Sequence, residues 1–150
     1  MTQREDLASV MDRLALDSLL TACAVAVDDG DWPAYEALFA PSGRVDLRGA
    51  GGEEGPAGEV ARRLAGALAD RPVRQHLLVN RQFRLPPGPL VREPGDRATV
   101  EADYVGRLGA SGPSSGGRCV FEAVRTDAGW LLERLTVRRK WPREASAPGR

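Results

Sequence analysis

The apolar residues of this chain change their spacing once, about halfway along the sequence. In the first 70 residues they recur at the three- and four-residue steps of helices, starting with Leu7, Val10 and Leu14 and continuing into the almost uniformly apolar segment 19–27. From residue 74 onward, β-branched and aromatic residues gather in segments separated by glycine and proline. Because helices precede strands rather than alternating with them, the pattern favours an α+β fold over βαβ winding.

Three helices are predicted before the long strands. After the first, Asp31 suits the N-cap of a short second helix, with Pro33 in its first turn and Pro41 as the residue that closes it. A third helix is predicted at residues 57–69, where apolar residues recur every four positions. The glycine-rich segment 49–55 is predicted to be a loop.

Strand-like segments fill most of the remaining sequence. They are predicted at residues 44–47, 74–85, 98–108, 118–126 and 130–141. We expect residues 1–141 to form one domain, since a chain of this length buries one substantial core. Residues 142–150 contain no large apolar side chain to anchor them, so that tail is expected to be disordered.

Charge and cysteine content narrow the classes of function. The 21 basic and 21 acidic residues give no net charge, so nucleic acid and anionic membranes are not expected partners. No segment approaches the roughly 20 apolar residues of a spanning helix, and the polar N-terminus resembles no signal peptide, which favours a cytoplasmic protein. Cys23 and Cys119 have no closely spaced partner, so we expect two buried thiols and neither a metal nor another cofactor.

Asp28 is the most informative acidic residue. It follows Ala24, Val25, Ala26 and Val27 on a helix, where an unpaired carboxylate would be costly to bury. A partner is therefore expected. The alternative is that Asp28 belongs, with the next two residues, to a solvated helix C-terminus that has no role in chemistry.

His76 is the only histidine in the chain. On a strand with alternating faces it shares a side with Leu78, Asn80 and Gln82. An imidazole there can take or give a proton near pH 7, as elimination, enolisation or cyclisation beside a carbonyl requires. A structural histidine satisfied within the core is the alternative.

Five segments, in order, resemble one known family. They are DxGDW at residues 28–32, a short helix ending in LFA, RVDLRG, RQHLLVN, and the closing GWLLERLTVRRKW. Over residues 5–141 they resemble the SnoaL-like branch of the nuclear transport factor 2-like superfamily, which includes scytalone dehydratase. The resemblance implies a cone in which a curved, mixed or antiparallel sheet and three N-terminal helices enclose a pocket.

The same resemblance implies catalytic roles for two residues. Asp28 and His76 match a catalytic aspartate and a pocket histidine of scytalone dehydratase, so the two form a candidate dyad in which the carboxylate fixes the tautomer and stabilises the imidazolium. Other family residues are missing. The strand 98–108 has no second histidine, and Val27 and Leu47 stand where water-positioning tyrosines are expected, so the same dehydration is not expected.

A second relative, ketosteroid isomerase, fits no better. Its general-base aspartate aligns with Leu47, whereas Asp46 is one residue off and should face away from the pocket. Its oxyanion tyrosine aligns with Cys23.

The remaining candidates for the pocket are mostly apolar, as a site for a flat or lipophilic molecule would be. Tyr104 can donate a hydrogen bond to a developing enolate, and Asn80 can orient a substrate oxygen, although each can equally serve the core. The predicted lining residues are Val27, Leu38, Phe39, Leu47, Leu78, Asn80, Tyr104, Cys119, Phe121, Leu135, Val137 and Trp141.

These observations support one leading hypothesis. It is a cofactor-independent cyclase, dehydratase or isomerase that acts on a polyketide-like or terpenoid-like carbonyl compound through Asp28 and His76. A non-catalytic ligand-binding module and an accessory subunit on the same fold are the alternatives. We also expect a homodimer through the outer sheet face, where Val105, Val124 and Leu132 are predicted to point outward.

Overall fold

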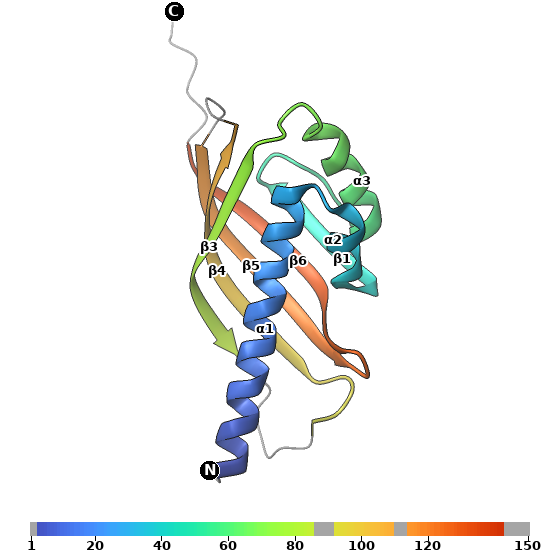
Figure 1. Cartoon of the computed structure of the whole chain (residues 1–150), viewed down its shortest axis with the longest axis vertical. Coiled ribbons are helices and arrows are strands. Elements are labelled where there is room, and N and C mark those ends of the chain that lie inside the picture. The colour runs from blue at the N-terminus through green and yellow to red at the C-terminus, as the bar shows by residue number, and fades with distance from the viewer. Residues whose placement is uncertain (1–2, 86–91, 110–113, 143–150) are drawn as a thin grey trace, which may run out of the picture.

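The structure, a computed structural model, describes residues 3–85, 92–109 and 114–142. Within these residues it contains three helices and six strands, with all three helices before the four long strands β3 to β6 (Figure 1). The predicted α+β fold is therefore confirmed. The tail predicted to be disordered lies, after Pro142, outside the described residues.

The helices are α1 (Gln3–Asp29), α2 (Trp32–Ala37) and α3 (Ala57–Ala67). Helix α1 ends at Gly30, whose φ of 68° is the left-handed conformation that closes many helices. As predicted, Asp31 caps α2, and its Oδ1 accepts a hydrogen bond from the Ala34 N–H at 3.1 Å. Pro41 does not close α2, because the helix ends at Ala37 and Pro41 already belongs to the next strand.

The strands form one mixed sheet in the order β2-β1-β6-β5-β4-β3. Only β1 and β6 pair in parallel. The bounds are β1 (Phe39–Gly49), β2 (Glu54–Pro56), β3 (Arg74–Arg84), β4 (Arg97–Leu108), β5 (Ser114–Thr126) and β6 (Gly129–Trp141).

Strand β2 overlaps the end of the segment predicted to be a loop, at Glu54 and Gly55. Its residues Glu, Gly and Pro have low strand propensity, so local sequence gives no signal for it. Pairing with β1 holds it at the sheet edge instead, with a bidentate contact between Arg44 and Glu54 across the two strands.

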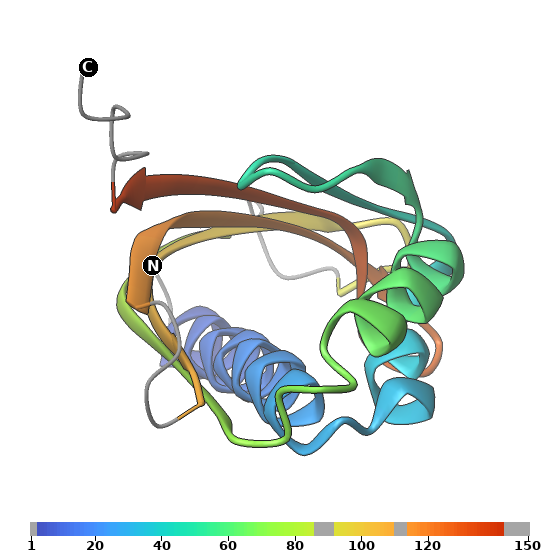
Figure 2. The same ribbon diagram turned by 90° about the horizontal axis from the view of Figure 1, so that it is seen from above.

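The sheet curves, and α1 runs along its concave side, while α2 and α3 cover one end (Figure 2). On β4 the side chains of Val100, Ala102 and Tyr104 are buried against this concave side, which we call the inner face. Asp103 and Val105 point to the opposite, outer face. Leu16, Leu20 and Phe121 are among the buried side chains that fill the space between α1 and the sheet; the whole set is the hydrophobic cluster.

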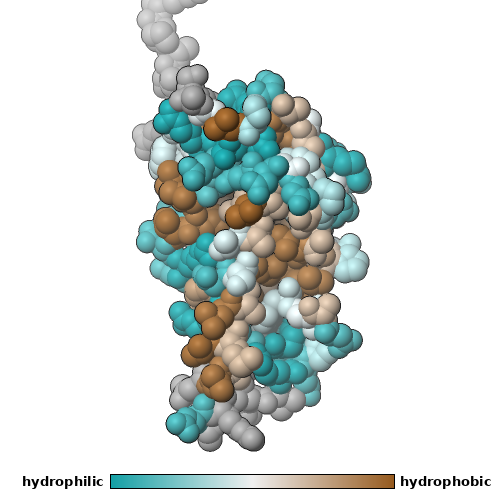
Figure 3. Space-filling view, in the orientation of Figure 1, coloured by the Kyte–Doolittle hydropathy of each residue, from teal (hydrophilic) through white to brown (hydrophobic). Residues whose placement is uncertain are grey.

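Apolar residues also lie on the solvent side of α1. In Figure 3 they follow the lower half of this helix, on the face turned away from the sheet. No helix within the described ranges is long and apolar enough to cross a membrane.

Strand irregularities reverse some predicted side-chain directions. The register between β5 and β6 shifts at Glu122 and Ala123, where Glu133 is the additional residue. Leu132 consequently lies opposite the buried Ala123 and is fully buried itself. The prediction that Leu132 points outward is wrong, because a one-residue insertion exchanges the two faces of a strand.

Candidate functional site

The last turn of α1 and the start of β3 bring Asp28 and His76 into contact. Asp28 Oδ2 accepts a hydrogen bond from the His76 backbone N–H at 2.8 Å, and Asp28 Oδ1 lies 2.5 Å from His76 Nδ1. The side chains are 16% and 25% exposed, respectively, so the pair is partly shielded from water yet remains accessible. The partner expected for Asp28 is therefore His76.

This contact determines the tautomer of the neutral imidazole. An ionised carboxylate can only accept hydrogen bonds, so Nδ1 of His76 must carry the hydrogen and Nε2 keeps its lone pair. Within the described residues, Nε2 has no hydrogen-bond partner, and it is therefore the nitrogen available to a bound molecule.

Gly106 makes room for the imidazole ring. It pairs with His76 across β3 and β4, and a Cβ atom there would lie 2.7 Å from Cδ2 and 3.0 Å from Nε2 of the ring. Any larger residue would displace the imidazole. Sequence analysis did not identify Gly106, although a glycine within a strand is a recognised signal of close approach.

Arg74 connects the helix that carries Asp28 to the strand that carries His76. Its Nε donates to the Val27 carbonyl at 3.1 Å, and its Nη1 donates to the Leu68 carbonyl at 3.0 Å. These carbonyls belong to helix ends, where intrahelical partners are lacking. Arg74 thus fixes the last turn of α1 and the end of α3 against the start of β3, and it too was missed by sequence analysis.

Most predicted lining residues lie in the hydrophobic cluster on the inner face. The buried members are Phe39, Tyr104, Cys119, Phe121 and Leu135, and the partly buried ones are Val27, Leu38, Leu47, Leu78 and Val137. They surround the region between α1 and the sheet, on the same face as His76.

Tyr104 is the polar member of this set nearest to the dyad along the sheet. It pairs with Leu78 and lies two residues before Gly106, on the same face of β4. Burial raises the pKa of Tyr104, although a hydrogen bond with Ser115 acts in the opposite direction. The phenol is therefore protonated at neutral pH and can donate a hydrogen bond.

The two cysteines are buried, as predicted. Burial raises the pKa of Cys23 and of Cys119 to about 12 in each case. Both are therefore neutral thiols near pH 7, a state in which cysteine is a poor nucleophile and a poor metal ligand. Within the described residues, no group of three or more His, Cys, Asp or Glu side chains is arranged to hold a metal ion.

Asn80 does not reach the predicted pocket. The register of β3 shifts between Val79 and Gln82, and Asn80 adopts a φ of 52°, which asparagine tolerates better than most residues. Its Nδ2 donates to Asp103 Oδ2 on the outer face at 3.0 Å. Gln82, predicted on the side of His76, also faces outward opposite Glu101.

Trp141 is also outside the predicted pocket. The pairing of β5 with β6 shifts between Gly116 and Gly117, with Lys140 as the additional residue. The indole lies over Gly116, so closely that a Cβ atom added to this glycine would overlap it. Gly116 pairs with Val105, which points to the outer face, so the indole lies on the outer face as well. Trp141 is exposed, and its assignment to the lining is wrong because the bulge turned it over.

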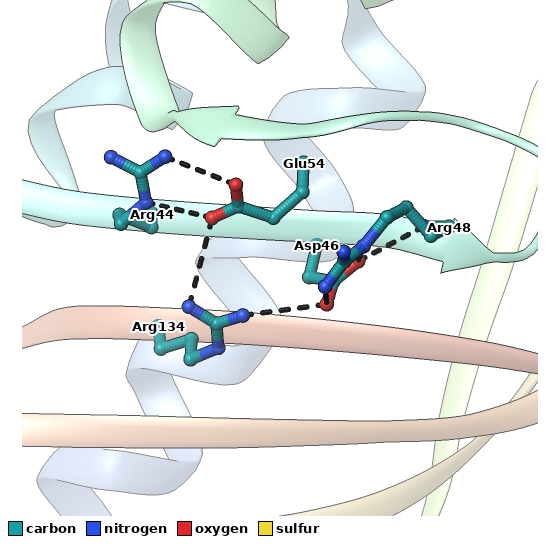
Figure 4. A network of polar contacts seen from close by, with 5 residues as sticks. All are labelled: Arg44, Asp46, Arg48, Glu54 and Arg134. Atoms are coloured by element: carbon teal, nitrogen blue, oxygen red, sulfur yellow. Dashed lines mark hydrogen bonds and ion pairs between the residues drawn. The ribbon is translucent and has the colours of Figure 1, made fainter.

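Asp46 faces away from the inner face, as predicted. Its carboxylate accepts hydrogen bonds from Arg48 Nε at 3.0 Å and from Arg134 Nη2 at 3.3 Å, within a network over β1, β2 and β6 (Figure 4). Hydrogen bonding from Arg48 lowers the pKa of Asp46 despite the opposing effect of desolvation. The carboxylate remains ionised and fully engaged at neutral pH.

A separate hollow of about 390 Å³ lies between α2, α3 and the beginning of β1. Phe39 is the only predicted lining residue that borders it. Glu36, Glu59 and Arg62 supply its charged groups, so this hollow differs from the apolar inner face beside the dyad.

Comparison with known proteins supports the architecture. The sequence profile of a family described as "SnoaL-like domain" matches residues 8–136. Among curated proteins, none matches the chain significantly in sequence. A crystal structure from Novosphingobium aromaticivorans, provisionally named an aromatic ring hydroxylase, is 29% identical, with 89% of this chain and 92% of that chain covered and a TM-score of 0.71.

Two further structures from the same species show the same fold at lower identity. One is provisionally named the beta subunit of an aromatic-ring-hydroxylating dioxygenase, with 18% identity, coverage of 94% of this chain and 96% of that chain, and a TM-score of 0.65. The other is provisionally named a scytalone dehydratase, with 16% identity, coverage of 99% of each chain, and a TM-score of 0.68.

Proposed function

Because the chain belongs to the SnoaL-like domain family of the nuclear transport factor 2-like fold, we propose that it is a cofactor-independent enzyme of the cyclase, dehydratase or isomerase kind. Its proposed substrate is a polyketide-like or terpenoid-like carbonyl compound. The observation that carries the proposal is the contact of Asp28 with His76, which leaves Nε2 of the imidazole available. Family membership alone does not select a reaction, since one fold hosts many activities.

Proton abstraction beside a carbonyl is the common first step of these reactions. His76 Nε2 takes a proton from the carbon α to the carbonyl, so that a C–H bond breaks, an N–H bond forms and the electron pair moves onto the carbonyl oxygen. Asp28 stabilises the resulting imidazolium through Nδ1–H. Tyr104 is the proposed donor to the enolate oxygen.

The enolate then has three outcomes. Reprotonation by His76 at another carbon gives an isomer. Expulsion of a β-hydroxyl that takes the same proton gives water and an alkene. Attack on a second carbonyl closes a ring, and the alkoxide formed there takes the proton from His76 to become a hydroxyl. The apolar inner face favours a flat, lipophilic substrate, since side chains such as Phe121 and Leu135 offer dispersion contacts and few hydrogen bonds.

Exchange of the α-hydrogen for deuterium tests this step without knowledge of the product. Flat polycyclic and terpenoid ketones are incubated in D₂O with the protein, and the loss of the α-proton signal is followed by NMR. Wild type is expected to accelerate exchange, whereas His76→Gln and Asp28→Asn are expected to reduce it. Asp29→Asn is a matched control, because this neighbouring carboxylate is exposed and lies outside the dyad.

Equal exchange rates in wild type and His76→Gln would contradict the proposed mechanism. Ligand binding with no exchange by wild type would instead favour the second candidate, a non-catalytic binding or accessory module. That candidate is supported by the oxygenase names of two structural relatives and by the absence of a second histidine on β4. A stable complex with a co-expressed, metal-containing oxygenase subunit would support the accessory role.

We also propose that two copies pair through the outer sheet face. Leu77 and Val105 are exposed and directly opposite each other on β3 and β4, and Val79 and Trp141 are exposed on the same face. Such a patch favours a protein partner. Val105→Glu should then lower the molar mass measured by light scattering; an unchanged mass would contradict this pairing.

A further inference from the structure

The solvent side of α1 is unusually apolar for a helix that already buries its other side. Leu7 and Leu14 are 61% and 63% exposed, and Val10, Met11 and Val25 are about half exposed. Leu16, Leu20 and Cys23, on the opposite side, pack into the hydrophobic cluster. The exposed residues therefore do not contribute to the core of a single chain.

These exposed positions follow the spacing of a coiled-coil seam. Steps of four and three residues alternate along the helix, which is the pattern of core positions that meet a partner helix. All the residues at these steps are exposed, and from first to last they extend over about 27 Å. We define the α1 seam as Leu7, Met11, Leu14, Ser18, Thr21 and Val25.

We propose that the α1 seam binds the α1 seam of a second copy of this chain, with the two helices antiparallel and the two-fold axis near residue 16. The seam has large side chains in its first half and smaller ones in its second. In the antiparallel arrangement Leu14 faces Ser18 of the other copy, Met11 faces Thr21, and Leu7 faces Val25. Large residues then meet smaller ones along the whole contact, as interdigitating layers require.

The charges beside the seam are also self-complementary. Arg13 and Asp17 lie on one flank of α1, and in an antiparallel pair this flank faces its own copy. Arg13 of each chain is then placed beside Asp17 of the other, which forms the same ion pair twice. Asp17 also contacts Arg81, yet its side chain is 50% exposed and can accept a further hydrogen bond.

The surroundings permit close approach of a second helix. The opposite flank carries the small exposed residues Ala15 and Ala22. On the charged flank, a groove of about 270 Å³ is lined by Val10, Arg13, Leu14, Asp17 and Phe83, and it offers space for side chains of the partner helix. The contact is isologous, so it closes after two copies and generates no filament.

This proposal is independent of the proposed enzymatic function and of the sheet-face pairing. If both surfaces are used and their two-fold axes intersect at right angles, the assembly is a closed tetramer. If only the α1 seam is used, the assembly is a dimer. In either case, a charge in the middle of the seam should halve the mass of the assembly.

Light scattering after size-exclusion chromatography measures that change. Leu14→Glu is expected to halve the molar mass of wild type, and Met11→Lys should act in the same way. Val73→Glu is the matched control, because Val73 is 65% exposed but lies before β3, outside the seam. Circular dichroism verifies that each variant is folded. An unchanged mass for folded Leu14→Glu overturns the proposal, and so does a monomeric wild type that co-sediments with phosphatidylglycerol vesicles.

Cysteine cross-linking tests the antiparallel register. Leu14→Cys and Ser18→Cys are oxidised separately and as a mixture, while the native Cys23 and Cys119 are buried. The mixture should form covalent dimers at least tenfold faster than either variant alone, because Leu14 faces Ser18. Faster cross-linking of each single variant with itself would indicate a parallel pair and would overturn the arrangement proposed here.

Discussion

Helix α1 contributes two carboxylates to the interior, and their partners are of different kinds. Near its C-terminus, Asp28 contacts a single histidine and remains partly exposed. Nearer its N-terminus, Asp12 is buried and accepts hydrogen bonds from Arg125, Arg92 and the indole N–H of Trp130.

The difference lies in whether the partner can change its charge. Arginine keeps its proton at any physiological pH, so the contacts of Asp12 with Arg125 and Arg92 are permanent. Arg125 is further held by Asp96 at 3.0 Å and by the ring of Trp130, 4.4 Å from its guanidinium. Histidine gains and loses a proton near pH 7, so the contact of Asp28 is compatible with proton transfer. One carboxylate therefore serves the fold, and we propose that the other serves the reaction.

Removal of the imidazole of His76 gives the largest expected effect, and it tests whether the contact with Asp28 serves the reaction. His76→Gln should slow the exchange reaction about a thousandfold, or about 4 kcal/mol in the barrier, because general base catalysis is lost. The free energy of unfolding, measured in urea, should change by less than about 1 kcal/mol because His76 is partly exposed. If His76→Gln lost stability but kept its activity, the contact of Asp28 with His76 would serve the fold and not the reaction.

Removal of the Asp12 carboxylate should act on stability instead. Asp12→Ala leaves Arg125 with only Asp96, and loss of one member of a buried ion pair costs about 3 kcal/mol. Urea denaturation measures this loss. Glu53→Ala is the control, since Glu53 and Arg63 form an exposed pair whose loss should cost less than about 1 kcal/mol. Equal losses in the two variants would show that the Asp12 cluster has no special role.

Replacement of Asp28 by its neutral amide should slow the exchange reaction, but less than loss of the imidazole does. The amide cannot stabilise the imidazolium that forms during the reaction as the carboxylate 2.5 Å from Nδ1 does, so Asp28→Asn should react about tenfold more slowly, or about 1.4 kcal/mol in the barrier. The rate of deuterium exchange measures this loss. An unchanged rate would mean that the contact does not assist the reaction and would remove the main support for the proposed enzyme.

Acid can weaken the Asp12 contacts only by protonating Asp12 itself, and this gives the smallest effect of the four. Burial acts to raise the pKa of Asp12, but the hydrogen bonds from Arg125, Arg92 and Trp130 outweigh it and leave the pKa below its usual value. The stabilisation is therefore complete above about pH 4 and is lost as the pH falls through the folded-state pKa. The stability difference between wild type and Asp12→Asn should shrink over that range in urea titrations; a constant difference would contradict the assignment.

The dyad was predictable because each member gave its own local signal. Asp28 stood out as a charge within an apolar helical segment, and His76 as the only histidine of the chain. The Asp12 cluster gave no comparable signal. Its members come from α1, from residues 92–96, and from β5 and β6, so the cluster exists only after these elements pack together.

The sequence by itself determined the order of helices and strands, the N-cap of α2, and the inward direction of residues on regular strands such as Tyr104, Cys119 and Phe121. Hydrophobic spacing and capping are local properties, so they can be read along the chain. Tertiary structure decided where the strand alternation breaks. The bulges that turned Asn80 and Trp141 to the outer face, and the edge strand β2, depend on pairing with distant strands, and that pairing is not encoded in any short segment.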